Sequence, residues 1–425
     1  MRARWIRRAL WCFCIAGLFL NVLDDPPLRS GAYLTEVTTE TATVARITRS
    51  PGSVVGRLFD ASGQVVGAEV VSAGRRRHRL QFPGLRPDTA YRFELEVDGA
   101  KEAGSFRTAP DSDEAKVRFA FLGDSGGQPW WVWLQRTPLL HLPARWGWFA
   151  DRTSVVGIGQ RIADYRPDFV LHLGDVIYPK GLHAHYFSGY FRPFGDVLRT
   201  APIYALLGNH DIMDARGQQM LANLRPPIGA ATGDGRCFSF AYGPVRVIML
   251  DFNLDLSGER VEDGHPAFEF LRRELDRCSE PWIVVASHFP IRSASRQGNT
   301  RADLMLKVMP LLRERGVSCY LSGHDHCYQR FVTSGDVVGL PLIVSGGGGK
   351  DLYDVRPDKY AAELRSAFHW CSAEVDGANM TITAHGLDGA QIDRVVLELP
   401  MAAELERLRI TQPERAKRID SRRRR

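Results

Sequence analysis

The chain has few cysteines and no arrangement of them that predicts disulfides. It contains seven in 425 residues. Cys12 and Cys14 lie in an apolar run near the N-terminus, and the remaining five are odd in number and irregularly spaced. Small domains that depend on disulfides carry a much denser pattern. A disulfide-stapled fold is therefore excluded, and the length is ample for a sizeable hydrophobic core.

The chain also lacks the charge pattern of a nucleic-acid-binding protein. Its formal net charge is +6, but four arginines stand within the first eight residues, and residues 413–425 carry seven bases against two acids. The remainder is mildly acidic and has no basic stripe with interleaved aromatic residues. We therefore expect no nucleic-acid partner. Residues 400–425 are expected to form a basic, solvated C-terminal tail.

No apolar run is long enough to span a membrane comfortably. The candidate run, residues 9–23, follows the four N-terminal arginines and precedes Asp24 and Asp25. A spanning helix needs about 20 apolar residues, whereas a basic start with a shorter apolar core is typical of a secretory signal. Because no cleavage site is well marked, residues 1–25 are expected to be a signal peptide or an uncleaved signal anchor. Both interpretations predict an exported body, periplasmic or extracellular, and the second adds membrane anchorage.

Residues 31–110 alternate short β-branched runs with turn signals that contain glycine and proline. This pattern predicts an all-β sandwich. Within it, residues 85–91, which read Leu-Arg-Pro-Asp-Thr-Ala-Tyr, resemble the tyrosine corner of a fibronectin type III domain. Tyr91 would fix the entry of a strand, so its role is structural. The expected unit is an immunoglobulin-like, fibronectin III-like domain without catalytic residues.

Residues 116–399 have the pattern of an α/β domain. Near-continuous apolar runs suit strands that are buried on both faces, and amphipathic stretches at residues 266–277 and 302–315 predict helices between some of them. The expected strands lie at residues 117–122, 169–173, 202–207, 245–250, 282–286, 317–321, 343–344, 371–375, 380–384 and 394–399. Sheets of this kind bind ligands beyond the carboxyl ends of their strands.

The run from Gly346 to Gly349, followed by Lys350, does not form a nucleotide-binding loop. The first glycine of that motif is missing, since Val344 stands at its position, and Asp351 replaces the Ser or Thr that the motif needs. We interpret the run as a flexible turn near the site.

Residues 128–150 hold five of the nine tryptophans of the chain. They are expected to form a packed covering loop. The alternative is a flap that faces a membrane or the substrate, since amphipathic aromatic side chains suit interfaces.

Five short polar motifs follow apolar runs, where strands are expected to end. Together they supply two carboxylates, one phenol, one amide oxygen and three imidazoles, with His210 in addition. Such a set suits two metal ions that share a bridging carboxylate, an arrangement used in phosphoryl transfer. The motifs are Gly123-Asp124-Ser125-Gly126, Gly174-Asp175-Val176-Ile177-Tyr178, Gly208-Asn209-His210-Asp211, Ser287-His288 and Gly323-His324-Asp325-His326. Since alternate side chains of an extended chain share a face, His324 and His326 are expected to point the same way while Asp325 points out.

The order of these motifs resembles the calcineurin-like metallophosphoesterase superfamily over residues 116–330. Most members have Asp-x-His in the first motif, whereas this chain has Asp124-Ser125-Gly126 and places Tyr178 three residues after Asp175. In both respects, and in its N-terminal β-domain, it is similar to the purple acid phosphatase branch. The resemblance implies a sandwich of two mixed sheets flanked by helices.

The resemblance also implies roles for the motif residues. Asp124, Asp175, Tyr178 and His326 would hold a first metal, expected to be Fe(III) because phenolate is a hard ligand. Asp175 would bridge to a second metal, Fe(II), Zn(II) or Mn(II), completed by Asn209, His288 and His324. Asn209 and His210 would contact the substrate, and His210 would protonate or stabilise the leaving oxygen. Tyr328 and Arg330 would support the last motif.

One departure from the branch concerns the pocket. Purple acid phosphatases commonly carry further histidines after the fourth motif, whereas residues 289–296 here contain arginines and no histidine. Substrate would then be held by Arg292 or Arg296, or leaving-group protonation would rest on His210 alone. This departure puts the acid optimum and the monoester preference in question.

The sequence predicts a phosphate-ester hydrolase. We expect an acid phosphatase-like enzyme that hydrolyses small-molecule phosphate monoesters by in-line attack of a metal-bound hydroxide. One alternative is a phosphodiesterase that acts on nucleotide or lipid headgroup esters. An alternative of another class is an exported adhesion or binding protein with a vestigial site, but no ligand of the set is missing.

Overall fold

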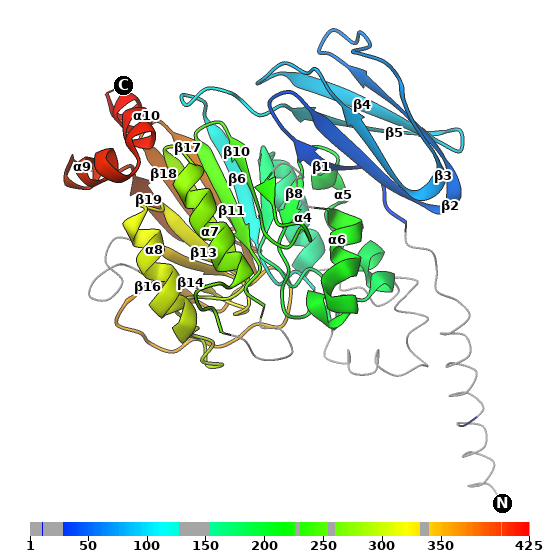
Figure 1. Cartoon of the computed structure of the whole chain (residues 1–425). Helices are drawn as coiled ribbons and strands as arrows, with labels where there is room; N and C mark the ends of the chain where they lie inside the picture. The colour runs from blue at the N-terminus through cyan, green and yellow to red at the C-terminus, as the bar shows by residue number, and fades with distance from the viewer. Residues whose placement is uncertain are drawn as a thin grey trace, which may run out of the picture.

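The computed structural model describes residues 11, 29–126, 154–225, 230–253, 260–331, 340–400 and 402–424. They form an N-terminal β-unit and a larger α/β unit (Figure 1). The tryptophan-rich residues 128–150 and nearly all of residues 1–25 lie outside this set, so the predictions for both segments stay predictions. Within the described part of the chain, no helix is long and apolar enough to cross a membrane.

The N-terminal unit is all-β, as predicted. The β2–β3 hairpin carries β1 on one end of β2 and the β4–β5 pair on the other. The sequence pattern indicated short strands, whereas residues 42–59 form one long strand, β2. The buried core of this N-terminal unit includes Val44, Leu58 and Phe93. The strands are β1 (Tyr33–Val37), β2 (Ala42–Phe59), β3 (Val70–Phe82), β4 (Ala90–Val97) and β5 (Ala100–Arg107).

The hydrogen bond expected of a tyrosine corner is present in this unit. The backbone N–H of Arg86 donates to the hydroxyl of Tyr91 over 3.0 Å. The ring of Tyr91 is buried and lies 5.8 Å from that of Phe106, between ring centroids. Tyr91 therefore fixes the start of β4, which is a structural role.

The α/β unit contains two mixed sheets, which confirms the predicted fold class. An eight-stranded sheet has the order β16-β14-β15-β13-β12-β11-β10-β9, and its strands β11, β12, β13 and β15 run parallel. Its strands are β9 (Ala230–Ala231), β10 (Phe238–Tyr242), β11 (Val245–Leu250), β12 (Trp282–Ser287), β13 (Cys319–Ser322), β14 (Tyr328–Phe331), β15 (Leu342–Ser345) and β16 (Ala361–Arg365).

A six-stranded sheet completes the unit, in the order β19-β18-β17-β6-β7-β8. Strands β6, β7 and β8 are parallel, and β17 joins β6 in the antiparallel direction. The strands are β6 (Val117–Leu122), β7 (Phe169–His172), β8 (Ile203–Ala205), β17 (His369–Asp376), β18 (Asn379–Gly386) and β19 (Gln391–Glu398).

The main core lies between the two sheets, and helices cover their outer faces. Side chains such as Phe121, Leu171 and Val284 meet in the central layer. Helices α7 (Pro266–Arg277) and α8 (Met309–Glu314) pack on the larger sheet, and α4 (Ser154–Tyr165) and α5 (Gly195–Leu198) pack on the smaller one. This layering explains why the apolar runs are continuous, since both faces of the central strands are buried.

The helix expected at residues 302–315 is interrupted. Leu304–Val308 form a wider π-type turn ahead of α8. Pro310 lacks the amide hydrogen that a regular helix would direct at the carbonyl of Leu306, and this accounts for the change of pitch.

The two units make polar and apolar contacts along β1. The hydroxyl of Tyr33 donates to the carbonyl of Asn223 over 2.7 Å, at the end of helix α6 (Gln218–Leu224). The backbone N–H of Val37 donates to the hydroxyl of Tyr204 over 3.3 Å. The ring of Tyr33 also packs against Phe191, with ring centroids 5.0 Å apart. The β-unit is thus attached to the smaller sheet and its helices.

The solvated C-terminal tail expected at residues 400–425 is not what the structure shows. Residues 402–424 form helices α9 (Ala402–Thr411) and α10 (Pro413–Arg423), which pack on the body through Leu405, Leu408, Ala416 and Ile419. Arg422, expected in solvent, is 4% exposed and donates to the carbonyl of Gly377. The charge count alone did not reveal the apolar residues that stand between the arginines in the sequence. It also did not reveal the backbone carbonyls of the body to which the guanidinium groups donate.

Arg415 is the buried centre of this attachment. Its side chain is among the largest that are fully buried, and its guanidinium donates to the carbonyls of Glu280, Pro281, Arg315 and Gly316. These carbonyls lie at loop positions, where no strand or helix supplies a donor. The side chain of Arg415 therefore joins two segments of the body, residues 280–281 and residues 315–316, to helix α10.

Replacing Arg415 with alanine should lower the free energy of unfolding by about 3 kcal/mol, because several buried carbonyls lose their donor. Urea denaturation of the purified protein measures this change. Lys417→Ala on the same helix is the matched control, since this side chain is 72% exposed and pairs only with Glu414 in its own helix. Equal stability of the two variants would contradict the role given to Arg415.

Candidate metal centre

The polar motifs lie at the carboxyl ends of neighbouring strands. Asp124, Asp175 and Asn209 follow β6, β7 and β8 of the smaller sheet, while His288 and His324 follow β12 and β13 of the larger one. The two sheets place these ends at the same edge of the sandwich. Residues that are 200 positions apart in sequence, such as Asp124 and His324, are therefore in hydrogen-bond contact.

A first group of donors surrounds the hydroxyl of Tyr178. This oxygen lies 2.9 Å from Asp124 Oδ1, 2.8 Å from Asp175 Oδ2 and 3.1 Å from His326 Nε2. All four side chains are buried, with exposures of 0–5%. The structure thus brings together the residues expected at the first metal position.

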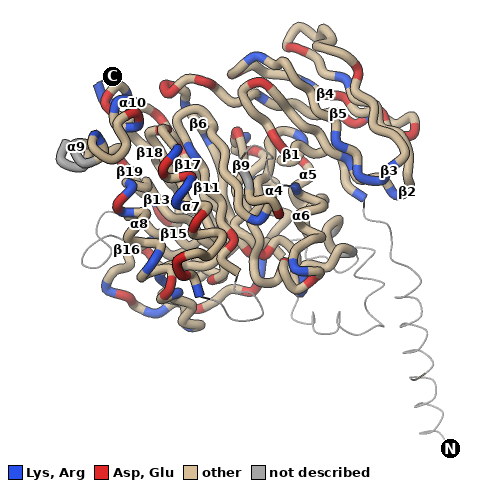
Figure 2. The backbone as a smooth tube through the Cα atoms, in the orientation of Figure 1, with Lys and Arg blue, Asp and Glu red and all other residues tan. Residues whose placement is uncertain are grey.

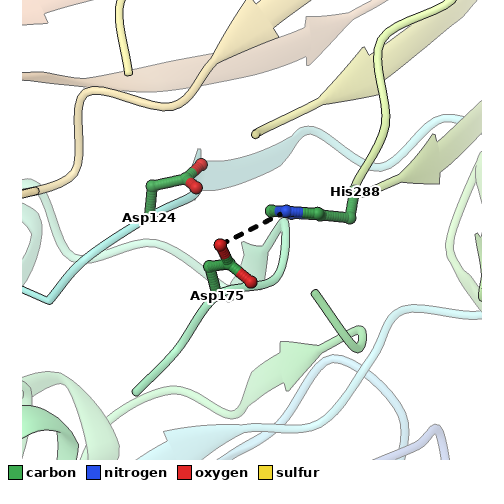
Figure 3. Close-up of side chains that lie close together, drawn as sticks. All are labelled: Asp124, Asp175 and His288. Atoms are coloured by element: carbon green, nitrogen blue, oxygen red, sulfur yellow. Dashed lines mark ion pairs between the residues drawn. The ribbon is translucent and has the colours of Figure 1, made fainter. Parts of the chain in front are cut away.

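A second group surrounds the side-chain oxygen of Asn209. Asn209 Oδ1 lies 3.0 Å from His288 Nε2 and 2.9 Å from His324 Nδ1. Asp175 links the two groups, because its Oδ2 lies 3.5 Å from His288 Nε2. Figure 3 shows the side chains of Asp124, Asp175 and His288 directed at one another, and one ligand atom from each falls within 4.8 Å of the others.

The hydrogen bonds around the histidines show that this set fits metal ions. His288 Nδ1 lies 2.8 Å from the carbonyl of Leu173, and His326 Nδ1 lies 2.7 Å from that of Asp351. A carbonyl only accepts, so each Nδ1 carries a proton and Nε2 is the ring nitrogen left to face the cluster. Nε2 of His288 faces the oxygens of Asn209 and Asp175. Such convergent acceptors repel one another unless a cation lies between them, so the donor set fits metals.

The electrostatics of the site agree with this interpretation. Burial lowers the pKa of His288, but the carboxylate of Asp175 outweighs that effect, and the pKa rises to about 10. Burial and the carboxylates of Asp124 and Asp175 raise the pKa of Tyr178 well above its usual value. Both shifts report a strongly negative environment that favours positive charge. A metal cation would supply that charge and allow the phenol to ionise.

The first motif lacks a histidine for a steric reason. A Cβ atom at Gly126, the position of histidine in the Asp-x-His pattern, would lie 2.3 Å from Tyr178 Cδ2. The ring of Tyr178 therefore occupies the space that a side chain at residue 126 would need. Gly208 is constrained in the same way, since its Cβ would lie 2.1 Å from Asp175 Oδ1.

His210 stands beside the two groups of donors and is more accessible than they are. Its backbone N–H donates to Asp175 Oδ1 over 2.8 Å, and its Nδ1 donates to the carbonyl of Pro179 over 2.6 Å. Its Nε2 lies 4.0 Å from Asp175 Oδ2, and its side chain is 29% exposed. The ring packs on Tyr178, with centroids 4.5 Å apart. The free face of the imidazole is thus held next to the candidate metal positions.

The structure does not bring Arg292 to this cluster. Its guanidinium bonds to Asp358 over 2.9 Å and lies over the ring of Tyr360, 4.3 Å from the centroid. Arg296 is 62% exposed and pairs with Asp354 over 3.5 Å. Tyr328 and Arg330 both donate to Asp393 on β19, so they tie β14 to the smaller sheet below the last motif.

Lys350 lies nearer to the cluster than either arginine, and sequence analysis did not select it. Its backbone N–H donates to the carbonyl of Asp124 over 3.0 Å, and its Nζ lies 5.5 Å from the centre of the Tyr178 ring. The lysine side chain is 14% exposed, and its one ion pair with a described residue is to the exposed carboxylate of Asp351, over 2.7 Å. The sequence feature that could have indicated Lys350 is the position of the glycine run, directly after the buried strand β15.

Asp211 was also missed. Its carboxylate accepts from the backbone N–H groups of Val176, Ile177 and Gly208 over 2.9–3.2 Å, so it joins the loops of the second and third motifs. Burial, followed by the charge of Asp175, raises the pKa of Asp211 to about 7. The sequence feature that could have indicated Asp211 is its position at the end of the Gly-Asn-His-Asp motif.

Asp325 differs in part from the expectation. Although His324 and His326 both reach the cluster, the carboxylate between them does not point to solvent. It is 0% exposed and accepts from Ser295, Asn299 and Gln329. The loop after His288 is thereby held against the last motif.

Comparison with known proteins agrees with this geometry. The family model described as calcineurin-like phosphoesterase matches residues 117–328. Tartrate-resistant acid phosphatase type 5 of Rattus norvegicus is 27% identical over 296 residues, which is 63% of this chain and 82% of the relative. Purple acid phosphatase 17 of Arabidopsis thaliana is 26% identical over 203 residues, which is 43% of this chain and 59% of that protein.

Solved structures show the same fold at low identity. The purple acid phosphatase PPD1 from yellow lupin seeds superposes with a TM-score of 0.70 at 16% identity, over 87% of this chain and 74% of that one. PhoD superposes with a TM-score of 0.64 at 11% identity, over 92% and 97%. Residues 117–328, which the family model matches, contain all five motifs and both groups of donors. The chain belongs to the calcineurin-like phosphoesterase family.

Proposed function

We propose that the chain is a dinuclear metal-dependent phosphoesterase that hydrolyses phosphate monoesters, as its acid phosphatase relatives do. The observation that carries this proposal is the convergence of buried oxygen and nitrogen lone pairs, which only cations reconcile. The similarity to tartrate-resistant and purple acid phosphatases supports the reaction class. A binding protein with a vestigial site is not supported, since no donor of the set is missing.

The geometry supports a division of the donors between two metals. Asp124, Tyr178 and His326 would hold the first, Asn209, His288 and His324 the second, and Asp175 contacts both groups. We propose Fe(III) for the first position, because a phenolate favours a hard trivalent ion. The second position suits Fe(II), Zn(II) or Mn(II), for which the same ligand types serve equally well.

Within this site the residues of the chain have distinct tasks. Metals bound here would activate water as a nucleophile near neutral pH and neutralise charge on the phosphoryl group. His210 keeps a proton on Nδ1 against the carbonyl of Pro179, so the proton that it transfers to the leaving oxygen is the one on Nε2. Asn209 would offer its amide N–H groups to a phosphoryl oxygen.

We assign the holding of the substrate phosphoryl group to Lys350 rather than to Arg292. The charge of Arg292 is already neutralised by Asp358, whereas Lys350 contacts the ring of a metal-ligating residue. Its ion pair with Asp351 involves a carboxylate that is 67% exposed, and such pairs contribute little. A phosphate dianion would therefore displace Asp351 readily.

A phosphodiesterase is the second candidate function. The absence of histidines from residues 289–296 and the occupied Arg292 leave fewer groups to neutralise a monoester dianion than the purple acid phosphatase pattern provides. Hydrolysis rates for paired mono- and diesters of the same alcohol separate the two candidates.

We further propose that the protein is exported and that its β-unit is a fibronectin III-like domain. The N-terminal sequence, with its arginines and apolar run, supports export, and the tyrosine-corner hydrogen bond supports the domain assignment. An uncleaved run at residues 9–23 would hold the body at the membrane.

Asp175→Ala should abolish phosphatase activity and reduce bound metal, because it removes the side chain that both groups of donors contact. Elemental analysis and hydrolysis of a chromogenic phosphate monoester measure the two effects. Asp376→Ala is the matched control, as this carboxylate is 63% exposed at the far end of β17. An active Asp175→Ala protein without metal would refute the mechanism.

Iron-loaded protein should show a visible charge-transfer band from the phenolate of Tyr178, and Tyr178→Phe should remove it. Absorption spectra recorded beside iron content measure this. A fully active, colourless protein that contains no iron would remove Fe(III) from the first position.

Lys350→Met should raise KM for a phosphate monoester about tenfold and weaken inhibition by inorganic phosphate to a similar extent, since one charge-assisted contact is lost. Metal content should stay unchanged. Lys307→Met, an exposed lysine that pairs with Asp263, is the control. Unchanged KM and phosphate inhibition would exclude Lys350 from the substrate site.

A further inference from the structure

A row of arginines lies on strand β3 of the N-terminal unit. Arg75, Arg77 and Arg79 occupy alternate positions, so their side chains share one face of the strand. Arg49 lies within β2 directly after Thr48, whose carbonyl accepts from Nε of Arg76 over 3.3 Å. Figure 2 shows a blue band of Lys and Arg residues along the β2–β3 hairpin.

The α/β unit adds a further cation to this row. Arg77 donates to Asn223 Oδ1 over 3.0 Å, and Arg225 follows two residues later at the end of α6. Burial, followed by the charge of Arg225, lowers the pKa of Arg79, which shows that the two guanidinium groups repel each other. We call Arg49, Arg75, Arg77, Arg79 and Arg225 the arginine face.

Few carboxylates offset the charge of this face. Glu102 is engaged by Arg46 at 2.8 Å, and Glu36 acts on Arg79 more weakly than Arg225 does. In the part of the chain that the structure describes, neither Arg49, Arg75 nor Arg225 forms an ion pair. A group of like charges with few carboxylates beside it is relieved of repulsion when it binds an external polyanion.

The N-terminal segment leaves the body at this same face. The backbone N–H of Ser30 donates to the carbonyl of Ile47, and Ile47 is the cross-strand partner of Arg77. The apolar run at residues 9–23 ends only a few positions before Arg29. Five extended residues reach at most about 17 Å. A bilayer that holds the apolar run would therefore lie close to the arginine face.

We propose that the arginine face binds the surface of an anionic lipid bilayer and orients the catalytic unit on it. The partner is a layer of anionic headgroups rather than a nucleic acid, because the face adjoins the apolar N-terminal run and the ring of Tyr33 beside Arg77 and Arg79 is buried, so it cannot stack on bases. Arginines near such a surface act over about one Debye length, roughly 8–10 Å at physiological salt. The apolar N-terminal run and the arginine face would thus both contact the same side of the membrane.

The test compares binding of the full chain to vesicles of neutral phosphatidylcholine and to vesicles that also contain phosphatidylglycerol. The apolar run contributes to both, so the ratio of the two partition coefficients isolates the electrostatic part. We expect the anionic vesicles to be preferred at low salt and the preference to fall steeply as salt rises. In the triple variant Arg49→Gln, Arg75→Gln and Arg225→Gln, the ratio should fall about fivefold per arginine.

The matched control removes three exposed arginines from helices α7 and α8, as Arg272→Gln, Arg277→Gln and Arg313→Gln. Both variants lose the same net charge, and phosphatase activity on a small soluble ester reports that each is folded. An equal fall of the ratio in both variants, or no fall in the first, overturns the proposal. Tighter binding to duplex DNA than to anionic vesicles, lost in the first variant alone, would assign the face to nucleic acid instead.

Discussion

The carboxylate of Asp175 is the group about which the site is organised. It accepts from the backbone N–H of His210 on one oxygen and from the hydroxyl of Tyr178 on the other, and it lies 3.5 Å from Nε2 of His288. Gly208 has no side chain because Asp175 fills that space. Three loops from two sheets therefore depend on the position of one side chain. A buried carboxylate at the meeting point of so many acceptors is stable only beside cations.

Much of this arrangement was predictable from the sequence, for a simple physical reason. Strands such as β6 and β12 are buried on both faces, so their sequences are nearly continuous apolar runs. A glycine and a polar residue directly after such a run therefore indicate the edge of the sheet where ligands bind. The order of the motifs then identified the family, and the side chains expected at each metal position lie together in the structure.

The remaining features depend on partners that are distant in sequence. Arg292 was expected at the substrate, but Asp358, 66 residues away, engages it. Lys350 was read only as the end of a glycine run, because its proximity to Tyr178 follows from the packing of β15 beside the first motif. The C-terminal arginines were interpreted as a solvated tail, since nothing local reveals that carbonyls near residues 280 and 316 need donors. The amino-acid composition of a segment does not determine its burial, because burial depends on the surface of the folded body against which the segment packs.

The pairing of β17 with β6 has a consequence for the order in which the molecule can form. Val117 lies opposite Val375, so the middle of the smaller sheet cannot be completed until almost the whole polypeptide has been synthesised. Loop closure over such a separation is slow compared with local helix or hairpin formation. The N-terminal β-unit has its own sheet and core and does not share this constraint, whereas the α/β unit cannot complete its smaller sheet before residues 369–376 are available.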